Sequence, residues 1–439
     1  MKADVVVIGA GAAGLAAARV LAQGSLDVVV VEARDRVGGR IFSVPSTDGS
    51  PPAELGAEFI HGPAEETRAL LAQSGGVALE TDGESWSGAG GRALVKSEYD
   101  FGSAGALLAG ARDLPEDRSV ARYLARFAGD DVKRETIETA RVFAEGFDAA
   151  DPEIASAWSI ADEILSGVDF SSAWPSAGYP PILAALTAQC LDAGVRLHLS
   201  TPVRAVRWQR GGVEVETTDA GGTPGIVCAR AAILAVPVGV LRDGDIAFAP
   251  DLPSRTREAL AFLEMGHVVK VIMRFATPFW ETIGDGRYRG AGFFRAGSGP
   301  FSAFWTQAPV HHSDLVVAWV GGPGAIRLHD ASPAERIDLA LAQFGAMLGD
   351  EAAARAAFAG GATHDWMRDP FARGAYSYVL TGGTDARRTL AEPLEGTVFI
   401  AGEATSTDGQ GGTVNGAIRT GERAAREALR AFGGKGDPR

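Results

Sequence analysis

One lysine stands in the middle of an apolar segment, a position that calls for a chemical explanation. The segment runs from Met265 to Phe275 and otherwise has the composition of a buried strand, with Lys270 at its centre. Burial of an ammonium group is costly unless an opposite charge pairs with it. One explanation is an edge strand whose Lys270 and Arg274, on the same side at a period of two, face solvent. The other is a pocket that uses the amine chemically.

A glycine motif near the amino terminus has the spacing of a nucleotide-binding turn. Gly9, Gly11 and Gly14 follow a predicted strand at 5–8 and open a predicted helix at 13–21. In this motif the first glycine makes the tight turn, the second lets the backbone approach a pyrophosphate, and the third lets helix and strand pack closely. The helix then presents its positive end to the phosphates. The motif predicts a dinucleotide site.

The residues that follow the next predicted strand, 28–31, complete this nucleotide site. Glu32 ends the strand, where its carboxylate can accept a hydrogen bond from a ribose hydroxyl and disfavours a 2′-phosphate. Arg34 and Arg40 bring positive charge beside the predicted pyrophosphate, and Gly39 allows a second close approach of the backbone. These features leave both NAD and FAD open.

The carboxy-terminal segment, 399–429, predicts a strand, a loop, a glycine turn and a helix that begins near Val414. Small and apolar residues recur in this helix at helical spacing, so it has one packing face. That face consists of Ile418, Gly421, Ala425, Ala428, Leu429 and Phe432.

Composition and charge limit the class of protein. The chain has 439 residues, enough for two or three domains, and its formal net charge of -14 argues against a nucleic-acid partner and is compatible with a cationic substrate. Two cysteines, Cys190 and Cys228, are too few for a disulfide framework and fit a reducing cytosol. No signal peptide or membrane span is recognisable, so we expect a cytoplasmic protein. His311 and His312 lack metal-ligand spacing, and we expect a surface loop there and no metal.

The stretch Glu54 to Gly62, ELGAEFIHG, together with the motifs at both ends, resembles the flavin-dependent amine oxidase family. That family includes monoamine oxidases, polyamine oxidases and lysine-specific histone demethylases, and the resemblance to its bacterial-type members covers nearly the whole chain. It implies an α/β fold in which a Rossmann-like FAD-binding domain of the glutathione-reductase type is interleaved with an α+β substrate domain of mixed sheet and helices. We expect the FAD domain at 1–78, 195–262 and 390–439. The substrate domain then takes 79–194 and 263–389, with a helical lobe near 100–185.

The resemblance also assigns roles to individual residues. Lys270 matches the lysine that holds a water against flavin N5, Tyr376 matches one of two aromatic residues that flank the substrate, and His61 matches a histidine of the substrate channel. Thr413 stands where the second aromatic residue is expected. Ala375 replaces the cysteine that carries covalent flavin in monoamine oxidases, so FAD should be non-covalent. The cofactor-binding residues implied are Gly9, Gly11, Ala13, Gly14, Glu32, Ala33, Arg34, Gly39, Arg40, Gly56, Ala57, Glu58, Val203, Gly402, Glu403, Thr413 and Val414.

The expected function is oxidation of a primary or secondary amine, and a polyamine-like substrate is one candidate. The resemblance implies hydride transfer from the amine α-carbon to flavin N5, imine hydrolysis, and reoxidation by O2 to give H2O2. Two alternatives stay open: a flavin oxidoreductase that acts on carbon–carbon bonds, such as a desaturase or porphyrinogen oxidase, and a non-catalytic FAD-bound interaction module. The sequence names neither the amine nor the oligomeric state.

Overall fold

The fold comes from a computed structural model of the chain, which describes residues 1–45, 52–81, 83–88, 93–97, 101–129, 134–168, 171–310 and 313–433. His311 and His312, predicted to lie in a surface loop, fall outside the described residues.

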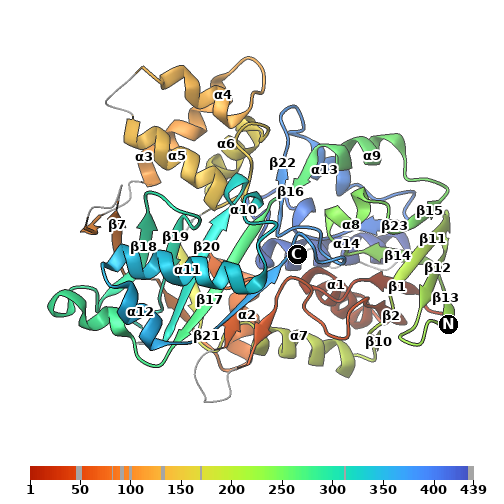
Figure 1. Ribbon diagram of the computed structural model, residues 1–439. Coiled ribbons are helices and arrows are strands. Elements are labelled where there is room, and N and C mark those ends of the chain that lie inside the picture. Colours follow the sequence, from red (N-terminus) through yellow and green to blue (C-terminus); the bar gives the residue numbers. More distant parts are fainter. Residues whose placement is uncertain are drawn as a thin grey trace.

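Five short parallel strands form the sheet that carries the glycine turn (Figure 1). Their order across the sheet, in the described part of the chain, is β10 (Arg196–His198), β2 (Val28–Val31), β1 (Val5–Ile8), β14 (Ala231–Leu234) and β23 (Val398–Ile400). Every residue of β1 and β2 is buried, because parallel strands of this kind are covered on both faces. The strands predicted at 5–8 and 28–31 are therefore confirmed.

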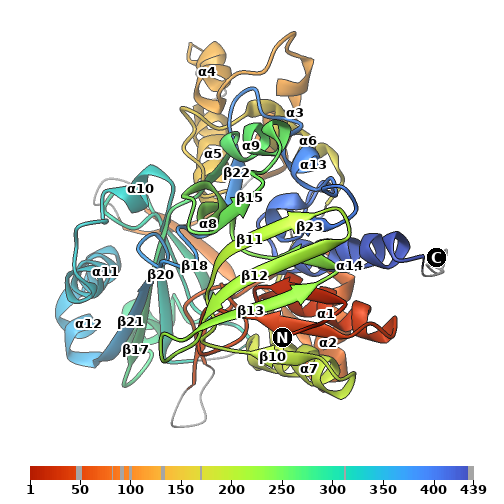
Figure 2. The ribbon, with the colours of Figure 1, turned by 90° about the vertical axis from the view of Figure 1, so that its right-hand side faces the viewer.

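Helices cover one face of this parallel sheet and a second sheet covers the other. The helices are α1 (Ala12–Gln23), α7 (Pro180–Asp192) and α14 (Val414–Ala431). In Figure 2 the second sheet lies in front of the parallel strands, in the order β13 (Pro224–Ala229), β12 (Gly212–Thr218), β11 (Val203–Gln209) and β15 (Ala247–Ala249). This layering confirms the predicted Rossmann-like unit.

The two ends of the chain meet where α14 crosses α1. A Cβ placed on Gly421 would lie 2.1 Å from the carbonyl oxygen of Ala13, so this crossing requires a glycine. Ile418, Ala425 and Ala428 are fully buried in the same core. The packing face predicted for the terminal helix is confirmed, and it places the middle of α14 against the first turn of α1.

A seven-stranded mixed sheet forms the second large unit. Its order in the described residues is β21 (Phe358–Asp365), β17 (Val268–Phe275), β20 (Leu315–Gly321), β19 (Ala303–Trp305), β18 (Ala291–Ala296), β7 (Glu84–Gly88) and β8 (Val95–Lys96). β17 pairs with β20 on one side and with β21 on the other, which places Lys270 opposite Trp319 and His364. The edge-strand explanation of Lys270 is therefore wrong, because β17 lies inside the sheet.

Helices pack on this sheet and above it. α11 (Pro333–Leu348) and α12 (Glu351–Ala357) cover one of its faces around Phe344, which is fully buried. A separate helical lobe stands at the top of the molecule in Figure 1. It contains α3 (Phe101–Ala109), α4 (Val120–Leu124), α5 (Arg134–Gly146) and α6 (Ala157–Leu165). These four helices fall within the range 100–185 predicted for a helical lobe, whereas α7, which overlaps the end of that range, packs against α1.

Shorter elements connect these units, so the chain passes between them several times. They are β3 (Ser43–Val44), β4 (Ala53–Glu54), β5 (Ile60–His61), α2 (Glu65–Gln73), β6 (Ala78–Glu80), β9 (Ser172–Pro175), α8 (Val238–Arg242), α9 (Ser254–Ala261), β16 (Leu263–Met265), α10 (Pro323–Ile326), β22 (Ser377–Val379) and α13 (Ala386–Leu390). The exact domain limits stay a prediction. None of the helices in the described residues has both the length and the apolar character needed to cross a membrane.

Candidate active site

A single cavity of about 1280 Å³ extends from the glycine turn after β1 to the helical lobe. Lys270, Tyr376 and His61 line it, and so does the start of α14. All residues that the sequence assigned to the site line this cavity except Gly14. The fold therefore brings the predicted residues together, while the role of each stays a prediction.

The glycine turn leaves open space at the cavity wall. Gly9 has a φ of +103°, which favours glycine, and a Cβ on Gly14 would lie 1.9 Å from the Gly9 carbonyl oxygen. Gly14 does not line the cavity. It lies behind the cavity wall, where it lets α1 approach β1 as predicted. A Cβ on Gly11 or on Gly402 would meet no atom within 4 Å, so the backbone at both positions borders open space. The first turns of α1 and α14 both line this space.

Glu32 is fixed at the end of β2 by backbone groups. Its Oε2 accepts a hydrogen bond from Ala10 N at 2.7 Å, and its Oε1 accepts one from Arg34 N at 2.9 Å. The carboxylate is 6% exposed and lines the cavity, where it is available to a ribose hydroxyl. The Arg34 side chain instead forms an ion pair with Asp369 at 2.6 Å, so its charge is partly neutralised within the protein.

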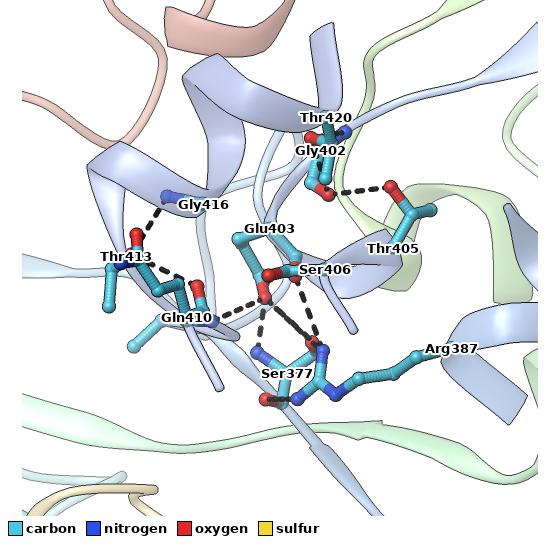
Figure 3. Close-up of polar contacts among 12 residues, drawn as sticks. Ser377, Arg387, Gly402, Glu403, Thr405, Ser406, Gln410, Thr413, Gly416 and Thr420 are labelled. Carbon is cyan, nitrogen blue, oxygen red and sulfur yellow. Dashed lines mark hydrogen bonds and ion pairs between the residues drawn. The ribbon is translucent and has the colours of Figure 1, made fainter. Parts of the chain in front are cut away.

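Glu403 joins the two ends of the nucleotide site. Its Oε1 accepts a hydrogen bond from Arg40 Nη1 at 2.8 Å, and its Oε2 accepts one from Ser377 Oγ at 2.7 Å. Figure 3 shows Ser377 and Arg387 beside this carboxylate. Burial alone would raise the pKa of Glu403, but the charges of Arg40 and Arg387 and the Ser377 hydroxyl together lower it. Glu403 therefore stays ionised although it is buried.

Thr413 caps α14 at its amino terminus. Its hydroxyl accepts a hydrogen bond from Gly416 N at 2.9 Å and donates one to the Gln410 carbonyl at 2.9 Å (Figure 3). The ring of Tyr376 lies beside Gly412, since a Cβ on that glycine would be 3.3 Å from Tyr376 Cδ2. One aromatic ring and a threonine cap thus occupy the positions where the resemblance implies two aromatic rings.

Lys270 is buried and paired. Its Nζ lies 2.5 Å from Glu58 Oε2 and 3.2 Å from the Gly56 carbonyl oxygen, to which it donates a hydrogen bond. The indole of Trp305 donates to Glu58 Oε1 at 3.0 Å. Both oxygens of Glu58 are therefore committed to protein partners, an arrangement that the predicted cofactor role of Glu58 did not foresee.

His61 lies on β5 and lines the cavity. Its Nδ1 is 3.0 Å from Ser172 Oγ, and its ring packs 5.0 Å from the ring of Phe147. Burial lowers the pKa of His61 to about 4, so the ring is neutral at neutral pH. A neutral ring can donate or accept a hydrogen bond but attracts no anion.

Two acidic residues of the helical lobe reach the same cavity. Asp148 and Glu163 both line it, and Asp148 Oδ2 is buried without a hydrogen-bond partner among the described residues. Burial raises the pKa of Asp148 to about 7, with Arg387 opposing the effect. Burial first, and then the charge of Asp148, raise the pKa of Glu163 well above its ordinary value. The nearby ring of Tyr376 has a raised pKa because of burial and then of Asp148 and Glu403.

Comparison with known proteins identifies the family. The family model of flavin containing amine oxidoreductases matches residues 12–97 and 107–429. The chain belongs to this family.

Relatives within the family differ in what they act on. The chain is 30% identical over 468 residues to polyamine oxidase 4 of Oryza sativa subsp. japonica, covering 97% of this chain and 88% of that protein. It is 27% identical over 454 residues to lysine-specific histone demethylase 2 of Homo sapiens, covering 96% of this chain and 53% of the demethylase. The chain thus spans about half the length of its histone demethylase relatives.

Solved structures of two oxidases share the fold. Putrescine oxidase with bound putrescine superposes with a TM-score of 0.80 at 24% identity, covering 98% of this chain and 99% of that one. Cyclohexylamine oxidase from Brevibacterium oxydans IH-35A gives 0.80 at 22% identity, with coverage of 99% and 100%. These likenesses establish the predicted fold class.

The cofactor of the flavin amine oxidoreductase family is FAD, and the cavity fits it. Open space borders Gly11 and Gly402, two helix amino termini line that space, and the buried Glu32 carboxylate stands at its edge. The two cysteines lie elsewhere: Cys190 Sγ contacts the Leu15 carbonyl under α1, and Cys228 is in β13. The described cavity wall contains no thiol, and the non-covalent binding of FAD stays a prediction.

Several residues of the site were not predicted from the sequence. Trp305 both packs in the core and lines the cavity. Ser377 and Arg387, which contact the Glu403 carboxylate, belong to no recognisable sequence motif. Asp148, in the turn after α5, and Glu163, in α6, are acids of the kind found on any solvated surface, so the sequence did not single them out. Glu58 did carry a signal, since it is an acid within the apolar run Leu55 to Ile60.

Proposed function

We propose that the chain is an FAD-dependent oxidase of cationic amines. The observation that carries this proposal is the single cavity, because it joins the nucleotide cradle at Gly11 to Lys270, Tyr376 and the acids of the helical lobe. FAD would extend from Glu32 along the glycine turn towards Lys270. The FAD-binding and substrate domains would keep the limits given by the sequence.

The chain's residues would bind and orient FAD without a covalent bond. The amino termini of α1 and α14 would face its negatively charged parts, and Arg40 would be held beside it by Glu403. When bound, FAD supplies the acceptor for the two electrons of the amine carbon and passes them to O2. The protein's own part is binding, orientation and exclusion of water.

The acids of the lobe support a substrate with positive charge. Asp148 and Glu163 face the cavity near Tyr376, and the raised pKa of Asp148 shows that its ionised form is poorly compensated. An ammonium group placed there would pair with that carboxylate and replace the lost solvation. A second amine, away from the one oxidised, fits this position, as in a diamine or a longer polyamine.

Neutral and polar groups would hold the reacting amine. Tyr376 offers an aromatic face, and His61 is neutral at physiological pH and carries no charge that repels a cation. Lys270, which also lines the cavity, would hold a water there. A primary or secondary amine that reaches this position must be neutral to react, so its proton has to leave first.

The test is product formation from a panel of amines. Purified protein supplied with FAD is incubated in air with diamines, polyamines, alkyl monoamines, an Nε-methyl-lysine peptide and a carbon–carbon substrate such as a porphyrinogen. We expect peroxide and a carbonyl product in equal amounts, with di- and polyamines faster than monoamines. Turnover of the porphyrinogen alone would favour the carbon–carbon alternative, and no turnover with bound FAD would favour the non-catalytic module.

A further inference from the structure

We propose that Glu58 is a positioning residue for Lys270, which it holds as a charged ammonium at a fixed place on the cavity wall. This inference rests on the proposed amine oxidation. It assigns to Glu58 a partner other than the cofactor and to Lys270 a defined protonation state.

The geometry fixes the Glu58 carboxylate from both sides. Lys270 Nζ lies 2.5 Å from Oε2, and Trp305 Nε1 donates to Oε1 at 3.0 Å. The lysine is held by a second contact, since its Nζ donates to the Gly56 carbonyl at 3.2 Å. The side chains of Lys270 and Glu58 are 6% and 7% exposed, so water screens the pair little.

The pairing determines which form of the lysine is present. An opposite charge in direct contact favours the charged form of an amine, whereas desolvation alone favours the neutral form. Removal of either partner leaves an uncompensated buried charge, which costs far more than an exposed ion pair contributes. Lys270 can therefore donate hydrogen bonds to a water or a substrate atom in the cavity, but it has no free electron pair with which to accept a proton.

A second carboxylate near Lys270 does not compete with Glu58. Glu54 of β4 accepts hydrogen bonds from Ser43 Oγ and from Tyr179 N. Burial raises the pKa of Glu54 to about 7, with these two hydrogen bonds and the charge of Lys270 opposing the effect. Its negative charge is thus weakened near neutral pH, and its oxygens have other partners.

The neighbouring strand offers no competing partner either. His364 of β21 is the register partner of Lys270, but its Nε2 contacts Asp369 at 2.8 Å. Asp369 also pairs with Arg34. Among the described residues, Glu58 is thus the carboxylate that contacts the lysine directly.

The small number of lysines allows a direct test. The chain has five, Lys2, Lys96, Lys133, Lys270 and Lys435, so lysine labelled with carbon-13 at Cε gives few signals, and Lys270→Met identifies the one of interest. We expect that signal to be that of an ammonium at pH 7.5 in the wild-type protein. In Glu58→Gln the signal at the same pH should move towards that of a neutral amine, because the counter-charge is gone. A neutral Lys270 in the wild-type protein, or an unchanged signal in the variant, would overturn the proposal.

Two controls separate the pair from general effects. Lys96 forms an exposed ion pair with Glu84 at 2.7 Å, and Glu84→Gln should leave the Lys270 signal unchanged. Glu58→Asp keeps the negative charge beside Lys270, so the Lys270 signal should stay that of an ammonium at pH 7.5. If Glu58→Gln does not fold, the wild-type signal and this Asp variant still decide the question.

The pH profile of amine oxidation tests the positioning role. Relative to its activity at neutral pH, Glu58→Gln should lose more activity at alkaline pH than the wild-type protein does, because its lysine has no counter-charge. A merely structural role would lower activity equally at every pH and would thus contradict the proposal. If the wild-type protein oxidised no amine, the proposed function would be wrong. The lysine signals would still report on the pair of Lys270 and Glu58.

Discussion

Arg40 and Glu403 connect the first nucleotide motif to the last. Arg40 Nη1 lies 2.8 Å from Glu403 Oε1 and also donates to the Ala375 carbonyl at 2.7 Å, next to Tyr376. The Glu403 carboxylate is 5% exposed and accepts further hydrogen bonds from Ser377. This ion pair between two residues assigned to FAD is therefore hydrogen-bonded to Ala375 and Ser377, the two neighbours of Tyr376, which the proposed function assigns to the amine.

Glu403→Gln should weaken both the fold and FAD binding. The change leaves Arg40 and Arg387 without their buried counter-charge, a loss on the order of 3 kcal/mol in free energy of unfolding. Urea unfolding with and without added FAD measures both effects. As a matched control, Asp314→Asn removes the partner of Arg274 at 3.0 Å on a more exposed part of β17 and should cost about 1 kcal/mol or less. Equal small effects of the two changes would contradict the linking role of Glu403.

FAD should be released completely when the protein is denatured. The described cavity wall has no cysteine, and Ala375 occupies the position at which covalent flavin was considered. We expect yellow protein, a colourless acid precipitate and all flavin in the supernatant, measured by absorbance. Flavin that stays with the precipitate would show a covalent bond.

The affinity for cations should depend on pH through Asp148. Its pKa of about 7 means that the carboxyl is mostly protonated below that value and ionised above it, so attraction for an ammonium rises with pH. A quaternary ammonium inhibitor keeps its charge at every pH, and its inhibition constant should fall several-fold between about pH 6 and 8. Asp148→Asn should remove this dependence. A wild-type inhibition constant that is flat over the same range would contradict the acidic substrate site.

The nucleotide site and the fold class could be predicted because their signals are local. The glycine turn at Gly9 and the helix beginning at Val414 each show within about 30 residues a pattern that physical chemistry ties to one structure. Burial of both faces of β1 likewise follows from its unbroken run of valine and isoleucine. The crossing of Gly421 over Ala13 is a consequence of that packing face.

The pairing of side chains could not be predicted because it depends on distant segments. Glu58 lies in a loop and Lys270 in a strand of another sheet, and nothing in either segment specifies the other. The same holds for Asp148 and Glu163, which become buried only when the lobe covers the cavity. The edge-strand explanation of Lys270 was wrong for this reason too, since β20 and β21 come later in the chain and cover both of its edges.

Lys270→Met should slow amine oxidation by about 100-fold, the scale of losing one positioned polar group. The single change leaves Glu58 buried without its counter-charge, although Trp305 still donates to it, so Lys270→Met/Glu58→Gln serves as a variant without that unpaired charge. Rapid mixing with amine and then with O2 times flavin reduction and reoxidation separately, with flavin content as the control. Wild-type rates in both phases with full FAD occupancy would show that the lysine is structural.

Anaerobic titration of the FAD-loaded protein with an amine tests the central claim most directly. The titration uses a diamine, followed by a longer polyamine and an alkyl monoamine, and records the flavin absorbance. An amine oxidase should lose its oxidised-flavin spectrum after about one equivalent of substrate, since one amine delivers two electrons. Admission of O2 should then restore the spectrum with one equivalent of peroxide. A flavin that stays oxidised with each of these amines, in protein that binds FAD fully, would contradict the proposed function.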